Sequence, residues 1–413
     1  MLLLTSLLAA VLPAHAALGD SYDTLDRTDG VIATGGDVNG DGYADVALLK
    51  NGRAYLYFGS VTGIGTTYGQ VRTTGLTDVN AAAMIWDVDG DGDDELVLGA
   101  SADNAGLGRI AICRGTAAGV DRCQRVADGT STAPGAGSEL AAAGDVNGDG
   151  RGDFVVSNAA GAVSVYTGNG TAVPSRFYTA RGLVHLVTGR ALAGGGDVNG
   201  DGYSDFFVGG LVSSEYEQGG LYVYRGAASS AGVRSQYVYY PHGYGPYYCG
   251  YGISMGYSVQ SVGDPNGNGY DDVIAGAPWD LSSCTYGINY LWYGNSRGVG
   301  SGTYTEFDGS DWTYDSYDFA RSTAGAADYN GDGMDDLAFG GSVVQVWYGT
   351  TTPWATGDSP QEYPDVYIHG YNPYGIVNDV YAAGDVNADG FDDLLVHRQT
   401  GDATWAFELY YGG

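Results

Sequence analysis

Carboxylate and amide side chains recur along this chain at a fixed spacing. The pattern D-x-[DN]-G-[DN]-G-x-x-[DE] occurs over residues 37–45, 87–95, 145–153, 197–205, 264–272, 328–336 and 385–393, with Ala388 in place of the first glycine in the last copy. Positions one, three, five and nine of each copy carry side-chain oxygens. A tight turn with such oxygens can bind a hard cation of calcium size, which takes about six to eight oxygen ligands.

The other positions of the pattern also favour a calcium loop. Position six is glycine in every copy, which suits a backbone with positive φ. Position seven varies, so we expect it to contribute only its backbone carbonyl. The predicted ligands of up to seven Ca²⁺ ions are Asp37, Asn39, Asp41, Tyr43, Asp45, Asp87, Asp89, Asp91, Asp93, Glu95, Asp145, Asn147, Asp149, Arg151, Asp153, Asp197, Asn199, Asp201, Tyr203, Asp205, Asp264, Asn266, Asn268, Tyr270, Asp272, Asp328, Asn330, Asp332, Met334, Asp336, Asp385, Asn387, Asp389, Phe391 and Asp393.

Two other interpretations of the pattern are weaker. An EF-hand needs a glutamate at position twelve and flanking helices, whereas position twelve here is apolar in every copy and the loop leads into short apolar runs that predict strands. An ion-free turn would also favour Asn-Gly-Asp-Gly. Seven copies that keep the same oxygen donors favour the ion. The second loop, with Glu95, and the fifth, with Asn268, depart most from the pattern.

The net charge of the chain limits the classes of partner that it can bind. Its 413 residues include 49 acidic and only 17 basic side chains, for a net charge of −32. Seven divalent ions would bring this to −18. A chain that remains so acidic is unsuited to nucleic acid and to anionic membranes. We therefore expect neither nucleic-acid binding nor membrane insertion.

The N-terminal segment predicts export. An apolar run over 2–12 is followed by Pro13 and the small-residue triplet Ala14-His15-Ala16, so we predict a signal peptide over 1–16 and a secreted or cell-surface location. Outside the cell, free calcium is plentiful and disulfides persist. The four cysteines allow three pairings. We predict Cys113 with Cys123, which flank a glycine-containing hairpin turn, and then Cys249 with Cys284.

The spacing of the loops predicts the architecture. Successive copies begin 50 to 67 residues apart, and the residues between them read as three further strands, so each repeat is a four-stranded unit. Seven such sheets arranged radially make an all-β, seven-bladed propeller of antiparallel blades over residues 17–413. The chain stops after a third strand, so we predict that Tyr22–Leu25 supplies the outer strand of the last blade and closes the ring.

The repeats resemble the FG-GAP repeats of the integrin α-subunit head. The fifth unit carries the resemblance best, because residues 264–278 contain the loop followed by Val-Ile-Ala-Gly-Ala-Pro. The resemblance covers about residues 17–413. It implies a calcium-binding seven-bladed propeller that acts in protein binding or adhesion. Secreted seven-bladed lectins and propellers attached to lyases are similar in the same repeat, so a lectin is the alternative function and a polysaccharide-acting enzyme is a weaker one.

A candidate ligand surface lies opposite the calcium loops. The connector before the fifth blade and the loops of that face are rich in aromatic side chains, which could stack on sugars or anchor a protein. They could equally pack long loops against the propeller. The candidate residues are Tyr244, Tyr247, Tyr248, Tyr251, Trp279 and Trp312. No catalytic motif is found, so we predict a non-enzymatic, monomeric protein whose partner is an extracellular protein or a glycan.

Overall fold

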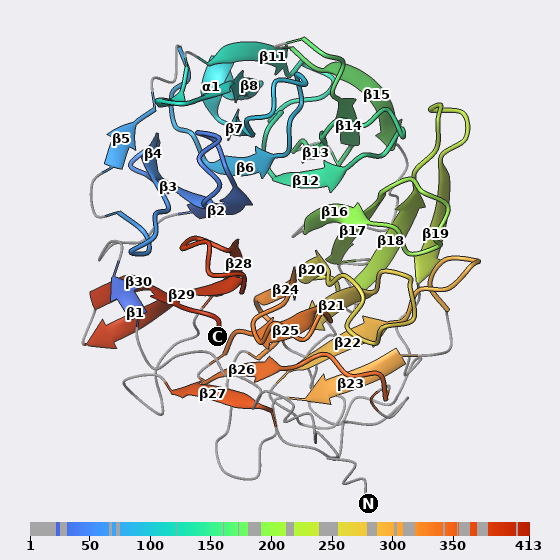
Figure 1. Ribbon diagram of the computed structural model, residues 1–413. Coiled ribbons are helices and arrows are strands. Elements are labelled where there is room, and N and C mark those ends of the chain that lie inside the picture. The colour runs from blue at the N-terminus through green and yellow to red at the C-terminus, as the bar shows by residue number, and fades with distance from the viewer. Residues whose placement is uncertain are drawn as a thin grey trace, which may run out of the picture.

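The computed structural model describes residues 22–24, 31–65, 68–71, 75–121, 123–159, 161–171, 173–180, 191–211, 219–238, 255–278, 287–300, 304–308, 319–341, 343–352, 354, 364–369, 379–401 and 404–413. Within these ranges the regular secondary structure is almost entirely strand, with a single helical turn, α1 (Asp103–Gly106). The strands form four-stranded antiparallel sheets, one for each repeat (Figure 1). The described residues therefore have the all-β character that the spacing predicted.

The first four blades follow the chain in order. Blade 1 contains β2 (Val31–Gly36), β3 (Asp45–Lys50), β4 (Arg53–Tyr57) and β5 (Tyr68–Gln70). Blade 2 contains β6 (Ala81–Ile85), β7 (Glu95–Ala100), β8 (Arg109–Cys113) and β11 (Gln124–Asp128), with a small hairpin of β9 (Gly115–Thr116) and β10 (Gly119–Val120) before its last strand. Blade 3 contains β12 (Leu140–Gly144), β13 (Asp153–Ser157), β14 (Val163–Thr167) and β15 (Ser175–Ala180). Blade 4 contains β16 (Leu192–Gly196), β17 (Asp205–Leu211), β18 (Gly219–Arg225) and β19 (Arg234–Val238).

The remaining three blades repeat the same order. Blade 5 contains β20 (Ser258–Ser261), β21 (Val273–Ala277), β22 (Ile288–Trp292) and β23 (Tyr304–Asp308). Blade 6 contains β24 (Thr323–Ala327), β25 (Asp336–Phe339), β26 (Val343–Trp347) and β27 (Val366–His369). Blade 7 contains β28 (Asp379–Gly384), β29 (Asp393–Gly401), β30 (Thr404–Tyr410) and, from the other end of the chain, β1 (Tyr22–Thr24).

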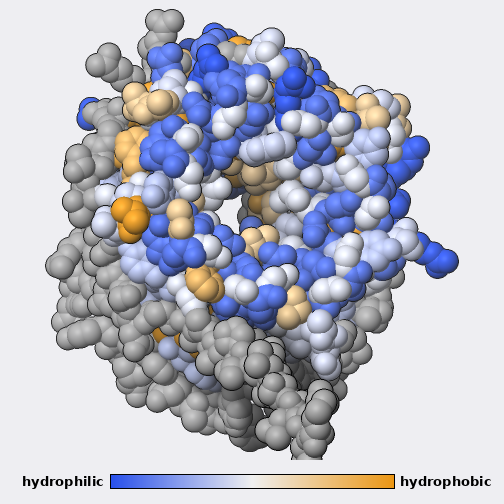
Figure 2. All heavy atoms as spheres, in the orientation of Figure 1, coloured by the Kyte–Doolittle hydropathy of each residue, from blue (hydrophilic) through white to orange (hydrophobic). Residues whose placement is uncertain are grey.

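The first strand of each blade lines the centre of a ring. Strands β2, β6, β12, β16, β20, β24 and β28 contact one another in that order, and β28 returns to β2. Figure 1 shows the seven sheets arranged around a common centre, and Figure 2 shows an opening there surrounded by mostly hydrophilic residues. The fold is a seven-bladed β-propeller, which confirms the predicted fold class.

The two ends of the chain meet in blade 7. Tyr22 is opposite Tyr410 and Thr24 is opposite Glu408, so β1 runs antiparallel to β30 at the outer edge of the sheet. The last blade therefore takes three strands from the C-terminal end and one from the N-terminal end. This is the pairing that the missing outer strand of the last repeat predicted.

The apolar core is divided among the interfaces between blades. Alternate residues of β3 point to opposite neighbours: Val46 and Leu48 pack with residues of blade 7, whereas Ala47 and Leu49 pack with residues of blade 2. Five further interfaces of the same kind complete the ring with clusters between consecutive blades. A sheet that is buried on both faces has near-continuous apolar strands, which explains the unbroken apolar runs after each loop.

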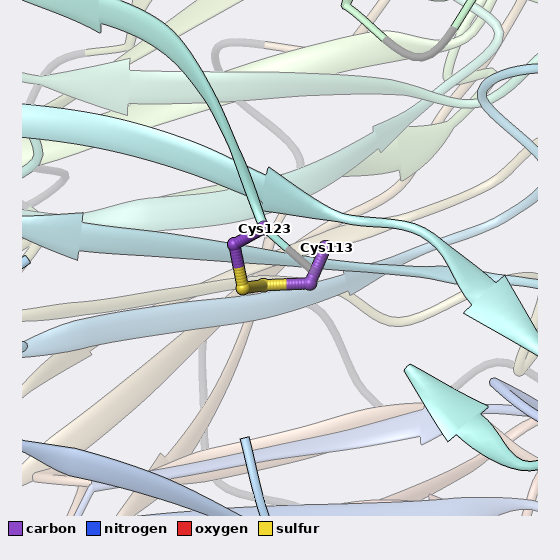
Figure 3. Close-up of a disulfide and its surroundings, with 2 residues drawn as sticks. All are labelled: Cys113 and Cys123. Atoms are coloured by element: carbon purple, nitrogen blue, oxygen red, sulfur yellow. A yellow bond between two sulfur atoms is a disulfide. The ribbon is translucent and has the colours of Figure 1, made fainter. Parts of the chain in front are cut away.

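A disulfide joins two strands of blade 2. Cys113 ends β8 and Cys123 precedes β11, and their sulfur atoms are bonded (Figure 3). The bridge lies across the base of the β9–β10 hairpin, and both cysteines are buried in the cluster shared with blade 1. Cys249, Cys284 and the predicted signal peptide lie outside the described residues.

Removal of β1 tests whether the ring depends on both ends of the chain. We expect a chain that begins at residue 26 to melt at a lower temperature than one that begins at residue 17, because β30 would become an unpaired edge. The exposed edge should also promote self-association. Calorimetry and light scattering after gel filtration measure the two effects. Equal melting temperatures and equal masses would contradict a closing role for β1.

Candidate metal centres

All seven acidic loops occupy equivalent places in the ring. Each joins the inner strand of a blade to its second strand, as in the connection from β2 to β3, so the loops gather on one face of the propeller. In most blades the pairing of these two strands shifts register just before the loop, as between Thr34 and Gly36. The irregularity turns the chain out of the sheet at the point where the oxygen donors begin.

Within a loop, the side-chain oxygens turn inward onto the backbone. In the first loop, the amide of Asp41 donates to Asp37 Oδ1 at 3.1 Å and to Asn39 Oδ1 at 3.0 Å. The amide of Gly42 donates to Asp37 Oδ2 at 2.7 Å, and that of Tyr43 donates to Asp41 Oδ1 at 3.1 Å. Positions one, three and five are therefore drawn together around one small volume.

The same hydrogen bonds recur in the third, fourth, sixth and seventh loops. The fifth loop keeps those to Asp264 and Asn268. The sixth-position glycine has positive φ in all seven loops, between 80° and 97°, as predicted. A side chain there would strain the backbone at the tightest part of the turn.

The position-nine carboxylate is the buried anchor of the site. Asp45 has no exposed surface, and its Oδ2 accepts from the amide of Val38 at 3.0 Å while its Oδ1 accepts from the amide of Gly59 at 3.0 Å. Gly59 follows the third strand, and a Cβ there would collide with the carbonyl of Ala44. The glycine after the third strand is thus explained in six of the repeats: it brings an amide to the buried acid. Asp153, Asp205, Asp336 and Asp393 are held in the same way.

Burial makes these acids hard to ionise without a cation. Desolvation raises the pKa of Asp45 to about 7 and that of Glu95 to about 8, even though backbone amides lower both. The carboxylates of the same loop raise them further by repulsion. Burial likewise raises the pKa of Asp153, Asp205, Asp272 and Asp336 to about 8 and that of Asp393 to about 7.

The donors of these loops fit a hard divalent cation. The side chains that converge are carboxylates and amides, the ligand types that calcium prefers, with no thiol or imidazole among them. A carboxylate has about four acceptor sites, so the two backbone amides on Asp45 leave room for an ion. In the second loop, one oxygen each of Asp87, Asp89 and Asp91 lie within 4.8 Å of one another, and Asp89 Oδ1 and Glu95 Oε1 are buried without a hydrogen-bond partner.

Position eight, for which the sequence pattern predicted no role, connects each loop to its neighbour. The amide of Asp264 in blade 5 donates to Asp335 Oδ2 in blade 6 at 2.8 Å. The amide of Asp37 donates to Asp94 at 2.8 Å, and Asp94 returns a bond from its own amide to the carbonyl of Asp37 at 3.1 Å. The pairs Asp197 with Asp271 and Asp328 with Asp392 repeat both bonds.

We call this hydrogen bonding between position one of a loop and position eight of the next loop the interblade clasp. The other junctions between blades differ from it. Between blades 3 and 4 a serine hydroxyl, that of Ser204, accepts from the amide of Asp145 at 3.0 Å. Between blades 7 and 1 only the backbone bond remains, because position eight is Ala44. Gly152 stands at this position in blade 3, where a Cβ would meet the carbonyl of Trp86. An acid at position eight in four of the seven copies is the signal from which the clasp could have been found.

Position seven also reaches the neighbouring blade. The rings of Tyr203, Tyr270 and Phe391 lie against the position-four glycine of the preceding loop, where a Cβ would come within 2.4–2.8 Å of the ring. The predicted backbone-carbonyl role of position seven remains a prediction, but its side chain covers the adjacent loop. This contact explains why aromatic residues are frequent there.

The predicted ligand surface cannot be placed in the same way. Tyr244, Tyr247, Tyr248, Tyr251, Trp279 and Trp312 all lie outside the described residues. Their assignment therefore rests on the sequence. Among the described residues, no helix has the length and apolar character needed to cross a membrane.

The fold and its loops define a class: a propeller of seven blades, each with an oxygen-rich hairpin on one face. Two family models match the chain. The FG-GAP-like repeat matches residues 37–98, which contain the first two loops, and the FG-GAP repeat matches residues 136–171, which contain the third. These matches support an FG-GAP, integrin α-like propeller.

Similar proteins of known identity include several integrin α subunits. Integrin alpha-4 of Xenopus laevis is 29% identical over 35% of this chain and 13% of its own length. Integrin alpha pat-2 of Caenorhabditis elegans is 29% identical over 46% of this chain and 17% of its own length. The chain spans less than a fifth of the length of these relatives. Among solved structures, that of BBS1N in complex with ARL6DN has the same fold, with a TM-score of 0.51, 10% identity and coverage of 95% and 97% of the two chains.

Replacement of Asp335 by alanine tests the interblade clasp. The amide of Asp264 would lose its acceptor in a partly buried place, which costs about 1–3 kcal/mol of unfolding free energy. Asp335→Asn keeps a carbonyl oxygen at that place and should lose less. Urea unfolding of both variants in calcium measures the difference. Equal stability of Asp335→Ala and the wild type would contradict the clasp.

Proposed function

We propose that this chain is a secreted, calcium-stabilised propeller that serves as a protein-binding or adhesion module. Residues 1–16 would be removed as a signal peptide, and residues 17–413 would form the propeller. The observation that carries the proposal is the sevenfold loop, in which carboxylate and amide oxygens converge beside a buried acid. In this proposal each loop binds one Ca²⁺ through positions one, three, five, seven and nine.

The ions would have a structural role. Without a cation, neighbouring carboxylates such as those of Asp37, Asp41 and Asp45 repel one another across a short turn. A calcium ion would neutralise this repulsion and fix the positions of the donors. Since position one of a loop is also hydrogen-bonded to the next blade, a fixed loop would hold the blade interface in register.

The binding role is supported by the integrin α resemblance. Several relatives that match the chain are integrin α subunits, and the FG-GAP-like family model matches residues that include the first two loops. Non-catalytic propellers present loops on their faces to a partner, and the loop-rich face opposite the calcium hairpins is the proposed surface. A partner outside the cell would meet the protein at the calcium concentration that such loops require.

Chelation tests the structural role of calcium. At about 1 mM calcium and a Kd of about 0.1 mM, each site contributes about 1.4 kcal/mol, and seven sites contribute roughly 10 kcal/mol. We therefore expect EDTA to lower the melting temperature strongly, with recovery on adding excess calcium. EDTA already saturated with calcium is the control. An unchanged melting curve in EDTA would refute the structural role.

Binding assays separate the three functional classes. A protein-binding module should retain a surface protein on immobilised propeller and give no signal on a glycan array. A lectin should instead bind particular glycans and lose them in the Trp279→Ala, Trp312→Ala or Tyr248→Ala variants. Release of unsaturated sugars from acidic polysaccharides would identify a lyase. Glycan binding sensitive to these variants would overturn the adhesion proposal.

A further inference from the structure

The second loop differs from the other six in its charge and in what lies against it. It carries aspartate at positions one, three, five and seven and glutamate at position nine, more acids than any other copy. Arg114, which follows β8 in the same blade, places its guanidinium on two of them. Its Nε lies 2.9 Å from Asp89 Oδ2 and 2.9 Å from Asp91 Oδ2, and its NH2 group also contacts Asp91.

The arginine takes the place of a hydrogen bond that other loops make internally. In the first, third, sixth and seventh loops, position three is asparagine, and its Nδ2 donates to the position-five aspartate at 2.8–3.3 Å. Asp89 cannot donate when ionised, so positions three and five of the second loop repel each other. Arg114 supplies the missing donors and a positive charge between the two carboxylates.

The location of Arg114 in its blade does not by itself explain this contact. Arg225 stands at the equivalent place in blade 4, immediately before the glycine whose amide holds the position-nine acid. Its NH1 is directed to the carbonyl of Arg297 in blade 5, at 3.5 Å, and the described residues include no ion pair between Arg225 and the fourth loop. The fourth loop has Asn199 at position three. The extra carboxylate of the second loop is therefore what draws the arginine in.

We propose that Arg114 is a built-in counter-ion of the second loop and competes there with the divalent ion. The inference rests on the proposed calcium function. A guanidinium and a calcium ion cannot both use Asp89 Oδ2 and Asp91 Oδ2, so the arginine must leave before the ion binds fully. Because it is tethered, its effective concentration at the loop is high. The second loop is then the last of the seven to fill as calcium rises and the first to empty as it falls.

The surroundings of Arg114 allow its guanidinium to be replaced by an ion. The side chain of Arg114 is 46% exposed, so it can turn outward into solvent. Asp89 Oδ1 and Glu95 Oε1 are buried and have no hydrogen-bond partner while the arginine is in place. The guanidinium leaves these two carboxylate oxygens without a partner, and a bound ion would use them as ligands. The loop thus keeps a role for calcium, at a higher concentration than its neighbours require.

Calcium titration of the full exported chain tests the proposal. Native mass spectrometry counts the ions bound as calcium is raised from micromolar to millimolar. Trp86, which directly precedes Asp87 and is 55% exposed, reports on the second loop through the difference in fluorescence between the wild type and a Trp86→Phe variant. In the wild type, the Trp86 signal should change after most of the ions have bound.

The variants make the expectation specific. Arg114→Gln should lower the Kd read from the Trp86 signal by about tenfold or more, and Arg114→Lys, which keeps the charge but loses the two-pronged contact, should fall between. Arg225→Gln is the matched control and should titrate like the wild type. If six other sites fill but Arg114→Gln leaves the Trp86 signal unchanged or shifts it to higher calcium, the inference on Arg114 is overturned and the calcium proposal stands. If no loop takes up calcium, both are overturned.

Discussion

Every blade of this propeller depends on its neighbours because its sheet is apolar on both faces. A four-stranded sheet such as β2–β5 cannot shield Val46 and Leu48 on one side and Ala47 and Leu49 on the other from water by itself. Each face is buried only when an adjacent blade packs on it. The apolar cluster between blades 7 and 1 is therefore needed as much as the other six. It closes the ring, in which β28 contacts β2.

The acidic loops are joined to this packing through the backbone. Position nine is buried at the base of the loop and binds amides from two parts of its own blade, while position one is bound by position eight of the next blade. The loop therefore connects the interior of one blade with the edge of another. Burial raises the pKa of the position-nine acid. The ionisation of that acid is therefore coupled to the folding stability of the blade. A divalent ion is the natural partner of such an arrangement.

Variation among the seven loops shows which features the geometry requires. The sixth-position glycine and the position-nine acid are present in every copy, because one allows the turn and the other anchors it. Position eight can be aspartate, serine, alanine or glycine, since the backbone bond between blades survives without a side chain at Ala44. Position three is asparagine or aspartate. An asparagine amide closes four of the loops onto position five, whereas the second loop, which has Asp89, is contacted by an arginine from elsewhere in its blade.

The sequence by itself determined the repeat, the number of blades and the strand that pairs with the last blade, because these follow from local spacing and side-chain chemistry along the chain. The clasp at position eight, the covering of one loop by the position-seven ring of the next, and the approach of Arg114 to Asp89 and Asp91 were decided by the tertiary structure. Each joins residues from different strands or blades. Their partners are fixed only when blade packing brings separate parts of the chain within hydrogen-bonding distance.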